Sequence, residues 1–319
     1  MDETKSIPDC VYHYCSVRAL HGIVTSGRFR LGNVFFMNDY MEVEWFKQIC
    51  RSILEENRDR ITKTTHTVHS PPAVSAGGGV TSSSSSSSSI SIAHARFYDR
   101  LMIELSKRAF DHVYCGCFSE VSDDLSQWRG YADDGRGVAL GVNLQQIIDA
   151  NKQARAPTDE GLVLEANPVE YVEKIHRKHA TEIIIPMAES LPAGEAVEGI
   201  AQAAFAFARL RPLAPRFKNP KFTGEREIRL VSHDTQFSNF VEKAEYNPVR
   251  LGMLPSDVRF YERKGKLVPF VEVTIPPEAV REVWVGPCFG DALDESALLL
   301  FLTKHQITAP IKRSKASYR

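Results

Sequence analysis

Apolar residues recur along the chain in short blocks. In some blocks they recur at every second position, which predicts strands, and in others at every third or fourth position, which predicts helices. The two kinds of block occur in mixed order. In residues 10–15 the spacing is two, so a strand would place Tyr12 and Tyr14 on one face and His13 on the other. The next block has helical spacing over residues 16–25, with Ser16 placed to cap its start and Gly27 to end it. Residues 28–31 are predicted to form a second short strand.

Residues 112–143 hold the densest set of polar and aromatic candidates for chemistry. A strand over residues 113–118 precedes a short helix that Asp123 or Asp124 can cap, and residues 138–142 return as a strand. One interpretation is a core unit in which Trp128 is the anchor. The other is that this rigid unit carries four side chains to the mouth of a pocket, namely Ser119, Glu120, Arg129 and Tyr131.

The remaining blocks predict a fold of mixed class. A helix over residues 39–53 begins with a capping box of Asp39 and Glu42. Further helices are predicted over residues 93–110, 144–150, 179–213 (divided by Pro192 and Gly194) and 295–305. Further strands are predicted over residues 162–165, 169–171, 225–231, 259–261, 269–274, 282–285 and 309–313. The fold class is therefore α+β, with mixed, largely antiparallel sheets flanked by helices.

Residues 61–92 differ in composition from the rest of the chain. They contain two consecutive prolines, three consecutive glycines and an unbroken run of eight serines. Such a segment has too little apolar surface to offset the loss of backbone entropy on folding. We expect a low-complexity flexible insertion within a single α+β domain that spans residues 1–319.

The overall charge limits the classes of partner, and the cysteine pattern bears on metal binding and on the state of the thiols. The formal net charge is −1 and the pI is near 6.8, so the composition indicates neither nucleic acid nor an anionic membrane as a partner. No apolar run approaches the roughly 20 residues of a membrane span, and the N-terminus lacks a secretory pattern. None of the six cysteines form a C-x2-C pair. These features predict a cytoplasmic protein with reduced thiols and no metal.

Several motifs, taken in order, resemble one known family. They are YHYCS, FFMNDYMEVE, CFSEVSDDLSQWRGYADDGRGVALGV, FKNPKFTGEREIRLV, ERKGKLVPFVEV, VWVGP and SKASYR. Together they resemble the bacterial family catalogued as domain of unknown function 2971, over nearly the whole chain outside the serine-rich segment. The family's name carries no activity, so this resemblance implies a fold but no mechanism.

A second resemblance, to ADP-ribosyltransferases, implies an activity. The order of parts in this chain is similar to the order in that superfamily. A strand with a histidine comes first and is followed by a serine-capped helix. A strand that ends in serine comes next, and then a strand that opens with Glu-x-Glu. The resemblance implies an ADP-ribosyltransferase-like fold, NAD as substrate, and Ser119 with Glu225 or Glu227 as catalytic residues. It implies that His13 and the Ser16 region contact NAD. The chain departs from the standard sets because it pairs a leading histidine with a serine, which leaves Tyr14, Trp128 and Tyr131 as candidates to stack on nicotinamide.

The chemistry implied is cleavage of the bond between nicotinamide and ribose, which develops an oxocarbenium-like centre. A carboxylate beside that centre would stabilise its charge. Two glutamates that are two residues apart on a strand face the same way, so one can hold the sugar while the other receives a proton. Arg129 or Arg229 would hold the pyrophosphate. Toxins and defence effectors are the biological roles we associate with such an activity, and the acceptor is not predicted.

Other interpretations remain open at this point. A non-catalytic module could bind a nucleotide or phosphate through Arg129, Lys218, Lys221 and Arg229. A metal-dependent nuclease would use Asp123, Asp124, Asp133 and Asp134, although these residues also suit helix caps and turns. Glu227 and Arg229 could also form only the solvated face of an edge strand. The NAD hypothesis requires that His13, Ser119 and Glu225 or Glu227 converge on one cleft.

Overall fold

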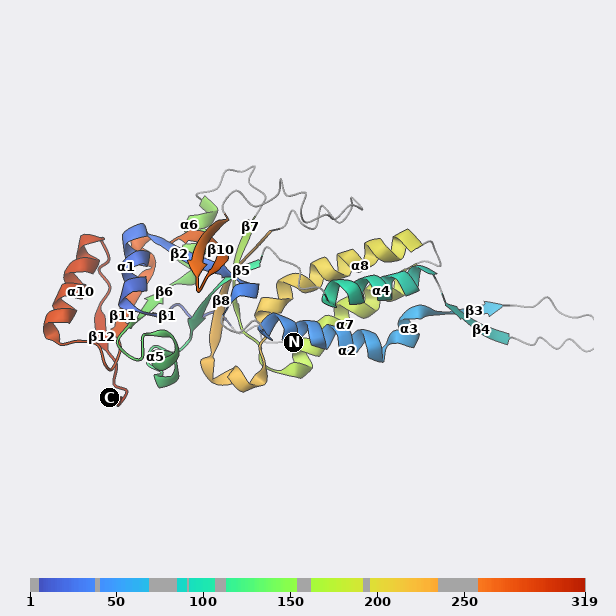
Figure 1. Ribbon diagram of the computed structural model, residues 1–319, viewed down its shortest axis with the longest axis horizontal. Coiled ribbons are helices and arrows are strands. Elements are labelled where there is room, and N and C mark those ends of the chain that lie inside the picture. The colour runs from blue at the N-terminus through green and yellow to red at the C-terminus, as the bar shows by residue number, and fades with distance from the viewer. Residues whose placement is uncertain are drawn as a thin grey trace, which may run out of the picture.

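The computed structural model describes residues 6–37, 41–68, 85–90, 92–106, 113–153, 162–191, 196–234 and 258–318. Its centre is a ten-stranded, open and largely antiparallel sheet that is flanked by helices (Figure 1). The predicted α+β class is therefore confirmed. The finer prediction of an ADP-ribosyltransferase-like fold stays a prediction.

The strands of the large sheet follow the order β12-β11-β6-β1-β5-β2-β10-β9, and β8 pairs with both β5 and β7. Among the described strands, β11 and β12 are the pair that runs in parallel. The strand bounds are β1 (Val11–Cys15), β2 (Arg28–Asn33), β5 (Val113–Ser119), β6 (Val138–Val142), β7 (Leu162–Pro168), β8 (Glu227–Asp234), β9 (Arg259–Arg263), β10 (Lys266–Thr274), β11 (Val280–Val285) and β12 (Ile311–Arg313).

Helices cover both faces of the sheet. The α-helices are α1 (Val17–Ser26), α2 (Met41–Glu56), α3 (Arg58–Thr62), α4 (Ile92–Ser106), α5 (Leu125–Tyr131), α6 (Leu144–Gln153), α7 (Glu173–Glu189), α8 (Ala196–Leu210) and α10 (Ala292–Lys304). Four short 3-10 helices are η1 (Val34–Phe36), η2 (Arg211–Arg216), η3 (Pro220–Glu225) and η4 (Pro277–Ala279).

Alternation along the strands divides the apolar residues between two main cores. Ile228 and Leu230 of β8 face the core that α1, α6 and α10 cover, whereas Val231 faces the core of α2, α4, α7 and α8. The latter four helices form a cluster that extends away from the sheet (Figure 1). A smaller cluster of Tyr14, Trp128, Ala132 and Ala139 holds α5 against β1 and β6.

Strand β5 is the point where the sheet divides. One of its edges pairs with β8 along its whole length. The other edge is shared, because β1 pairs with it at Ser119 and β2 pairs with it at Tyr114 and Cys115. The strands β1 and β2 therefore diverge from each other across the middle of β5.

Local signals predicted several elements well. Ser16 caps α1 through its hydroxyl, and Gly27 ends the helix at φ 62°, a conformation that glycine adopts without strain. Asp124 caps α5, and β6 has the predicted bounds. The predicted opening of α2 at Asp39 lies outside the described residues.

Other predicted elements differ from the structure. The two strands predicted within residues 162–171 are one strand, β7, followed by an isolated bridge between Glu170 and Phe217. The predicted helical region of residues 179–213 begins earlier, at Glu173, and contains two helices and η2. Pro192 and Gly194, which were predicted to divide it, lie outside the described residues.

The serine-rich segment is described only at its ends. Strands β3 (Lys63–Val68) and β4 (Ser85–Ile90) pair antiparallel in a separate two-stranded sheet, where no strand was predicted. Residues 69–84, with the start of the serine run, lie outside the described residues. The flexibility of this segment and the single-domain boundary therefore stay predictions.

Candidate functional site

Three adjacent strands bring three polar side chains into one row. Tyr12 of β1 is paired with Ser119 of β5, and Ser119 is paired with Glu227 of β8. Directly paired residues of neighbouring strands face the same side of a sheet. Tyr12 and Ser119, which are 107 positions apart in the chain, therefore become neighbours because β1 and β5 lie side by side.

A pocket of about 260 Å³ lies over this row. This volume is slightly below the roughly 300–1,000 Å³ of common small-molecule sites, so the pocket suits part of a dinucleotide. Its lining includes His13, Ser119, Glu225 and Glu227, the residues that the NAD hypothesis requires at one cleft. The complete lining is Tyr12, His13, Tyr14, Met37, Cys117, Phe118, Ser119, Gln127, Tyr131, Lys218, Phe222, Glu225 and Glu227.

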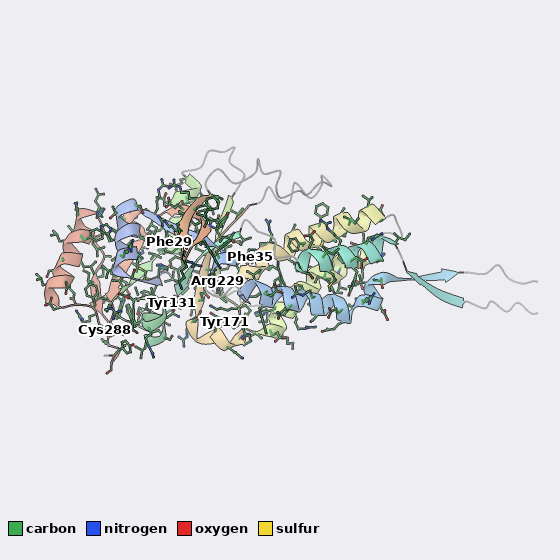
Figure 2. All side chains as sticks on the ribbon, in the orientation of Figure 1. Phe29, Phe35, Tyr131, Tyr171, Arg229 and Cys288 are labelled. Carbon is green, nitrogen blue, oxygen red and sulfur yellow. The ribbon has the colours of Figure 1, made fainter. Side chains whose placement is uncertain are left out.

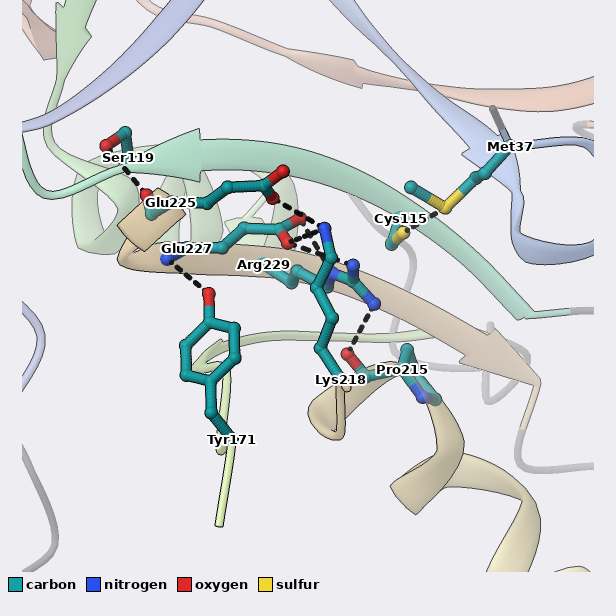
Figure 3. Close-up of polar contacts among 9 residues, drawn as sticks. All are labelled: Met37, Cys115, Ser119, Tyr171, Pro215, Lys218, Glu225, Glu227 and Arg229. Atoms are coloured by element: carbon teal, nitrogen blue, oxygen red, sulfur yellow. Dashed lines mark hydrogen bonds and ion pairs between the residues drawn. The ribbon is translucent and has the colours of Figure 1, made fainter. Parts of the chain in front are cut away.

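The two glutamates reach the pocket by different routes. Glu227 is the first residue of β8, whereas Glu225 is the last residue of η3 and lies outside the strand. The prediction that both lie on one strand is therefore wrong. Arg226 between them has φ 44°, in the left-handed region, and redirects the backbone. Both carboxylates nevertheless meet at Lys218, whose Nζ lies 2.6 Å from Glu225 Oε2 and 3.1 Å from Glu227 Oε2 (Figure 3).

Two positively charged side chains, Arg229 and Lys218, contact the carboxylate of Glu227. Its Oε1 accepts from Arg229 Nε at 2.8 Å and its Oε2 accepts from the same guanidinium at 3.0 Å. Burial alone would raise the pKa of Glu227, but Arg229, through its charge and hydrogen bonds, and Lys218 lower that pKa to about 2. The Glu227 side chain is only 6% exposed, whereas that of Glu225 is 21% exposed. Glu225 is therefore the carboxylate that a ligand can reach more easily.

Arg229 does not line the pocket. The residue is 1% exposed, and its guanidinium donates to Glu227 and to the carbonyl of Pro215 at 3.0 Å. Strand β8 lies between β5 and β7, so the interpretation of Glu227 and Arg229 as the solvated face of an edge strand is wrong. The geometry assigns Arg229 to the ion pair with Glu227 rather than to a pyrophosphate (Figure 3).

Ser119 links β5 to the segment before β8. Its hydroxyl donates to the carbonyl of Glu225 at 3.0 Å and accepts from the backbone of Val121 at 3.2 Å. The backbone N–H of Glu227 donates to the hydroxyl of Tyr171 at 3.0 Å. Ser119 and Tyr171 therefore fix the backbone that carries both glutamates (Figure 3).

His13 borders the pocket but points to the other face of the sheet. Its ring packs edge-on against Phe29, with 4.6 Å between centroids, and it also contacts Phe118. Its Nδ1 donates to the carbonyl of Cys117 at 3.0 Å, which bridges the gap where β1 and β5 diverge. Burial lowers the pKa of His13, so the imidazole is neutral at neutral pH. The residues of β1 that share the face of Ser119 and line the pocket are Tyr12 and Tyr14.

The three aromatic candidates have different places. Tyr14 and Tyr131 line the pocket. Tyr14 donates its hydroxyl hydrogen to the carbonyl of Val121 at 2.8 Å, and burial raises its pKa. Trp128 is fully buried against Tyr14 and does not line the pocket, as the core interpretation predicts. The stacking candidates that the geometry retains are therefore Tyr14 and Tyr131; Figure 2 labels Tyr131 in the part of the molecule that contains the large sheet.

Three further predicted residues lie away from the pocket. Ser16 caps α1 and lines a neighbouring hollow of about 450 Å³, which His13 also borders. Arg129 is on the outer side of α5, where its guanidinium lies 5.6 Å from the centre of the Tyr318 ring. Lys221 is exposed on η3 and does not line the pocket.

The four aspartates of the nuclease hypothesis have separate roles. Asp123 accepts from the indole of Trp128 at 2.7 Å and from the backbone of Lys315 at 2.8 Å. Asp124 is a helix cap, Asp133 pairs with Arg136, and Asp134 accepts from the hydroxyl of Tyr318. Within the described ranges, no three histidine, cysteine or acidic side chains gather as a metal site would require.

The sequence patterns gave no role to several residues that line the pocket. Gln127 stands within a predicted core helix and Phe222 lies in an irregular segment, so neither position predicts a place in a site. Tyr12 was identified only as a member of an alternating strand. Glutamine beside a helix cap carries no distinctive pattern, so only the tertiary structure reveals its place in the pocket.

One segment of the chain that contributes to this site matches a known family. Residues 127–230 match the family described as protein of unknown function (DUF2971). The predicted resemblance is therefore confirmed over these residues, whereas its extension over nearly the whole chain stays a prediction. The DUF2971 match contains Gln127, Tyr131, Lys218, Glu225 and Glu227 of the pocket, whereas β1 and β5 precede it. The chain matches no curated protein and no solved structure.

Aromatic side chains and carboxylates line the same pocket. Lys218 and Arg229 balance the charges of Glu225 and Glu227, so this cluster of four has no net charge. None of the described helices has the length and apolar character to cross a bilayer.

Proposed function

We propose that the protein consumes NAD, as an ADP-ribosyltransferase or an NAD glycohydrolase. The observation that supports this proposal is that Ser119, Glu225 and Glu227, from distant parts of the chain, line one pocket, with His13 at its border. A pocket with aromatic side chains and a carboxylate suits a nicotinamide riboside, whose cleavage develops positive charge on the ribose.

Glu225 is the carboxylate that we assign to the ribose. It has one ion-pair partner, Lys218, and retains part of its surface. Glu227 is already bonded by Arg229 and Lys218, so its role is to position Lys218 and the backbone before β8. Tyr14 and Tyr131 would form the aromatic wall for nicotinamide. The substrate class is NAD, and toxins or defence effectors are the corresponding biological roles.

The test is the release of nicotinamide from NAD by the purified protein, compared with Glu225→Gln. The amide keeps the shape of the side chain but cannot stabilise the developing charge, so we expect turnover to fall at least ~100-fold. The matched control is Glu189→Gln, which removes a surface ion pair with Arg60 on the helices far from the pocket. The control should keep full turnover.

The folded state of each variant must be compared by thermal unfolding before turnover is interpreted. Glu227→Gln is a poor activity test, because it leaves the charge of buried Arg229 without its main partner. Release of nicotinamide at the normal rate by a folded Glu225→Gln protein would overturn the assigned role. Absence of release by the folded wild-type protein would overturn the proposed activity.

A second candidate is a module that binds a nucleotide without chemistry. The observation that favours it is the neutralisation of both carboxylates by Lys218 and Arg229. This candidate predicts a different result from the NAD-consuming activity. NAD or a nucleotide would raise the melting temperature of the protein, but no nicotinamide would accumulate during long incubation. Lys218→Met should then weaken this binding.

A further inference from the structure

Gln127 is a buried amide with unused hydrogen-bonding groups. It lies in the first turns of α5, is 7% exposed and lines the same pocket as Glu225. Its backbone N–H donates to the cap residue Asp124 at 3.2 Å, but its side-chain amide makes no hydrogen bond with any other residue in the described part of the chain. Tyr131, one turn further along α5, lines the pocket beside it.

The oxygen and nitrogen of the Gln127 amide are not among the enclosed polar atoms that lack a partner, so in the free protein they can bond to water in the open pocket. A ligand in the pocket can replace this water and take over its hydrogen bonds. Two other polar side chains of the pocket are already engaged: the Ser119 hydroxyl donates to the carbonyl of Glu225 and accepts from the backbone of Val121, and the Tyr14 hydroxyl donates to the carbonyl of Val121. The Gln127 amide, in contrast, still offers a ligand both a donor and an acceptor.

The chemistry of a glutamine side chain limits what that ligand can be. The amide presents one acceptor and one donor side by side, and it pairs best with a group that presents the opposite pair. A primary carboxamide is such a group. We propose that Gln127 binds the carboxamide of nicotinamide, and that the nicotinamide end of NAD therefore enters this pocket.

This inference rests on the proposed function and makes it more specific. The bond that is cleaved joins nicotinamide to ribose, so nicotinamide and the carboxylate of Glu225 must share one pocket. With a volume of about 260 Å³ the pocket suits one end of the dinucleotide. The aromatic side chains of Tyr14 and Tyr131 provide faces on which the pyridine ring can lie.

The same geometry predicts rejection of the corresponding acid. Nicotinic acid carries a carboxylate where nicotinamide carries the amide, so it has no N–H to donate to the Gln127 oxygen. The four charged side chains Glu225, Glu227, Lys218 and Arg229 balance one another and offer the carboxylate no net attraction. The protein should therefore bind nicotinamide more tightly than nicotinic acid.

The test measures binding of nicotinamide, nicotinic acid and adenosine to the full-length protein by titration calorimetry or ligand-observed NMR. We expect nicotinamide to bind at least ~10-fold more tightly than nicotinic acid. Gln127→Leu should lower the affinity for nicotinamide ~10-fold and leave that for adenosine unchanged. Gln153→Leu, an exposed glutamine at the end of α6, is the matched control and should change none of these affinities.

A second variant keeps the proposal testable if Gln127→Leu does not fold. Gln127→Glu has nearly the same shape but no N–H to donate, so it should weaken nicotinamide binding as well. For both variants, the same loss should appear in KM for NAD, with nicotinic acid adenine dinucleotide as the comparison substrate.

The outcomes separate this inference from the proposed activity. Tight, Gln127-dependent binding of nicotinamide without cleavage of NAD would support the inference and reject the activity. Cleavage of NAD with equal affinity for nicotinamide and nicotinic acid, or with no effect of either Gln127 variant, would support the activity and overturn the inference. A Gln127-dependent affinity for adenosine would overturn the proposed orientation of NAD.

Discussion

Glu227 shows how a single residue can appear catalytic in the sequence and yet serve the structure. Its carboxylate bonds to both Arg229 and Lys218 while it is almost completely buried. A buried charge is tolerated only when its partners replace the water that it has lost. Glu225, two residues earlier, has a single partner and faces the pocket, so it is the better candidate for chemistry.

The lowered pKa of Glu227 predicts a dependence of stability on pH. Its folded-state pKa of about 2 lies below its ordinary value of 4.5, so its stabilising effect is complete above about pH 5 and is lost as the pH falls from there towards 2. The full shift corresponds to a loss on the order of 3 kcal/mol. Urea denaturation at pH 7, 4 and 3 would measure it.

Because other carboxylates titrate in the same range, the informative quantity is the difference in unfolding free energy between the wild type and Glu227→Gln. We expect this difference to be largest at pH 7 and to shrink below pH 4. A constant difference across this range would contradict the assigned ion pairs.

At the scale of elements, helix α5 is fixed in place by the C-terminal segment. Asp123, just before the helix, accepts from Trp128 of α5 and from both Ser314 and Lys315. The Tyr318 hydroxyl donates to Asp134 at 2.6 Å in the turn that follows the helix. These contacts join the two ends of α5 to residues almost 200 positions away, and they thereby hold Gln127 and Tyr131 at the pocket.

We expect Asp123→Ala to lower the free energy of unfolding by about 1–3 kcal/mol, because it leaves the buried indole N–H of Trp128 without its acceptor. Asp149→Ala is the comparison, since Asp149 is exposed on α6 and accepts only from Gln145 in the same helix. That change should remain within about 0.5 kcal/mol. Equal stability of the two variants in urea denaturation would show that the tail does not anchor α5.

At the scale of the whole molecule, one sheet separates two cores. The central strands β5 and β8 contribute side chains to both, since Phe118 and Leu230 face one core and Cys115 and Val231 face the other. The pocket lies on the side of the helical cluster, where α5 and the segment before β8 approach the sheet. Figure 2 shows Tyr131, Arg229 and Tyr171 in this middle region.

Because the strands are shared, we expect both cores to unfold together. Leu101→Ala in the helical cluster and Leu140→Ala in β6 each remove a fully buried side chain, and each should cost about 2–5 kcal/mol. Both should lower the same calorimetric transition, whereas Leu300→Ala on the exposed side of α10 should have little effect. Two transitions, each affected by only one of the variants, would contradict the prediction of a single domain.

Elements with local signals can be predicted from the order of residues alone. The caps of α1 and α5, the bounds of β6 and the placement of Trp128 in the core all depend on residues within a few positions of each other. These interactions form between neighbours in the chain, so composition and spacing are sufficient to predict them.

The construction of the site depends on contacts between segments that are far apart in the chain. The departure of Glu225 from the strand depends on the left-handed backbone of Arg226, and the burial of Arg229 depends on the position of β8 between β5 and β7. The choice of Tyr12 rather than His13 as a residue of β1 that faces the pocket depends on which side of the sheet α5 and the helical cluster cover. Strand order and the partners of buried charges arise from contacts between distant segments, and no local pattern in the chain encodes them.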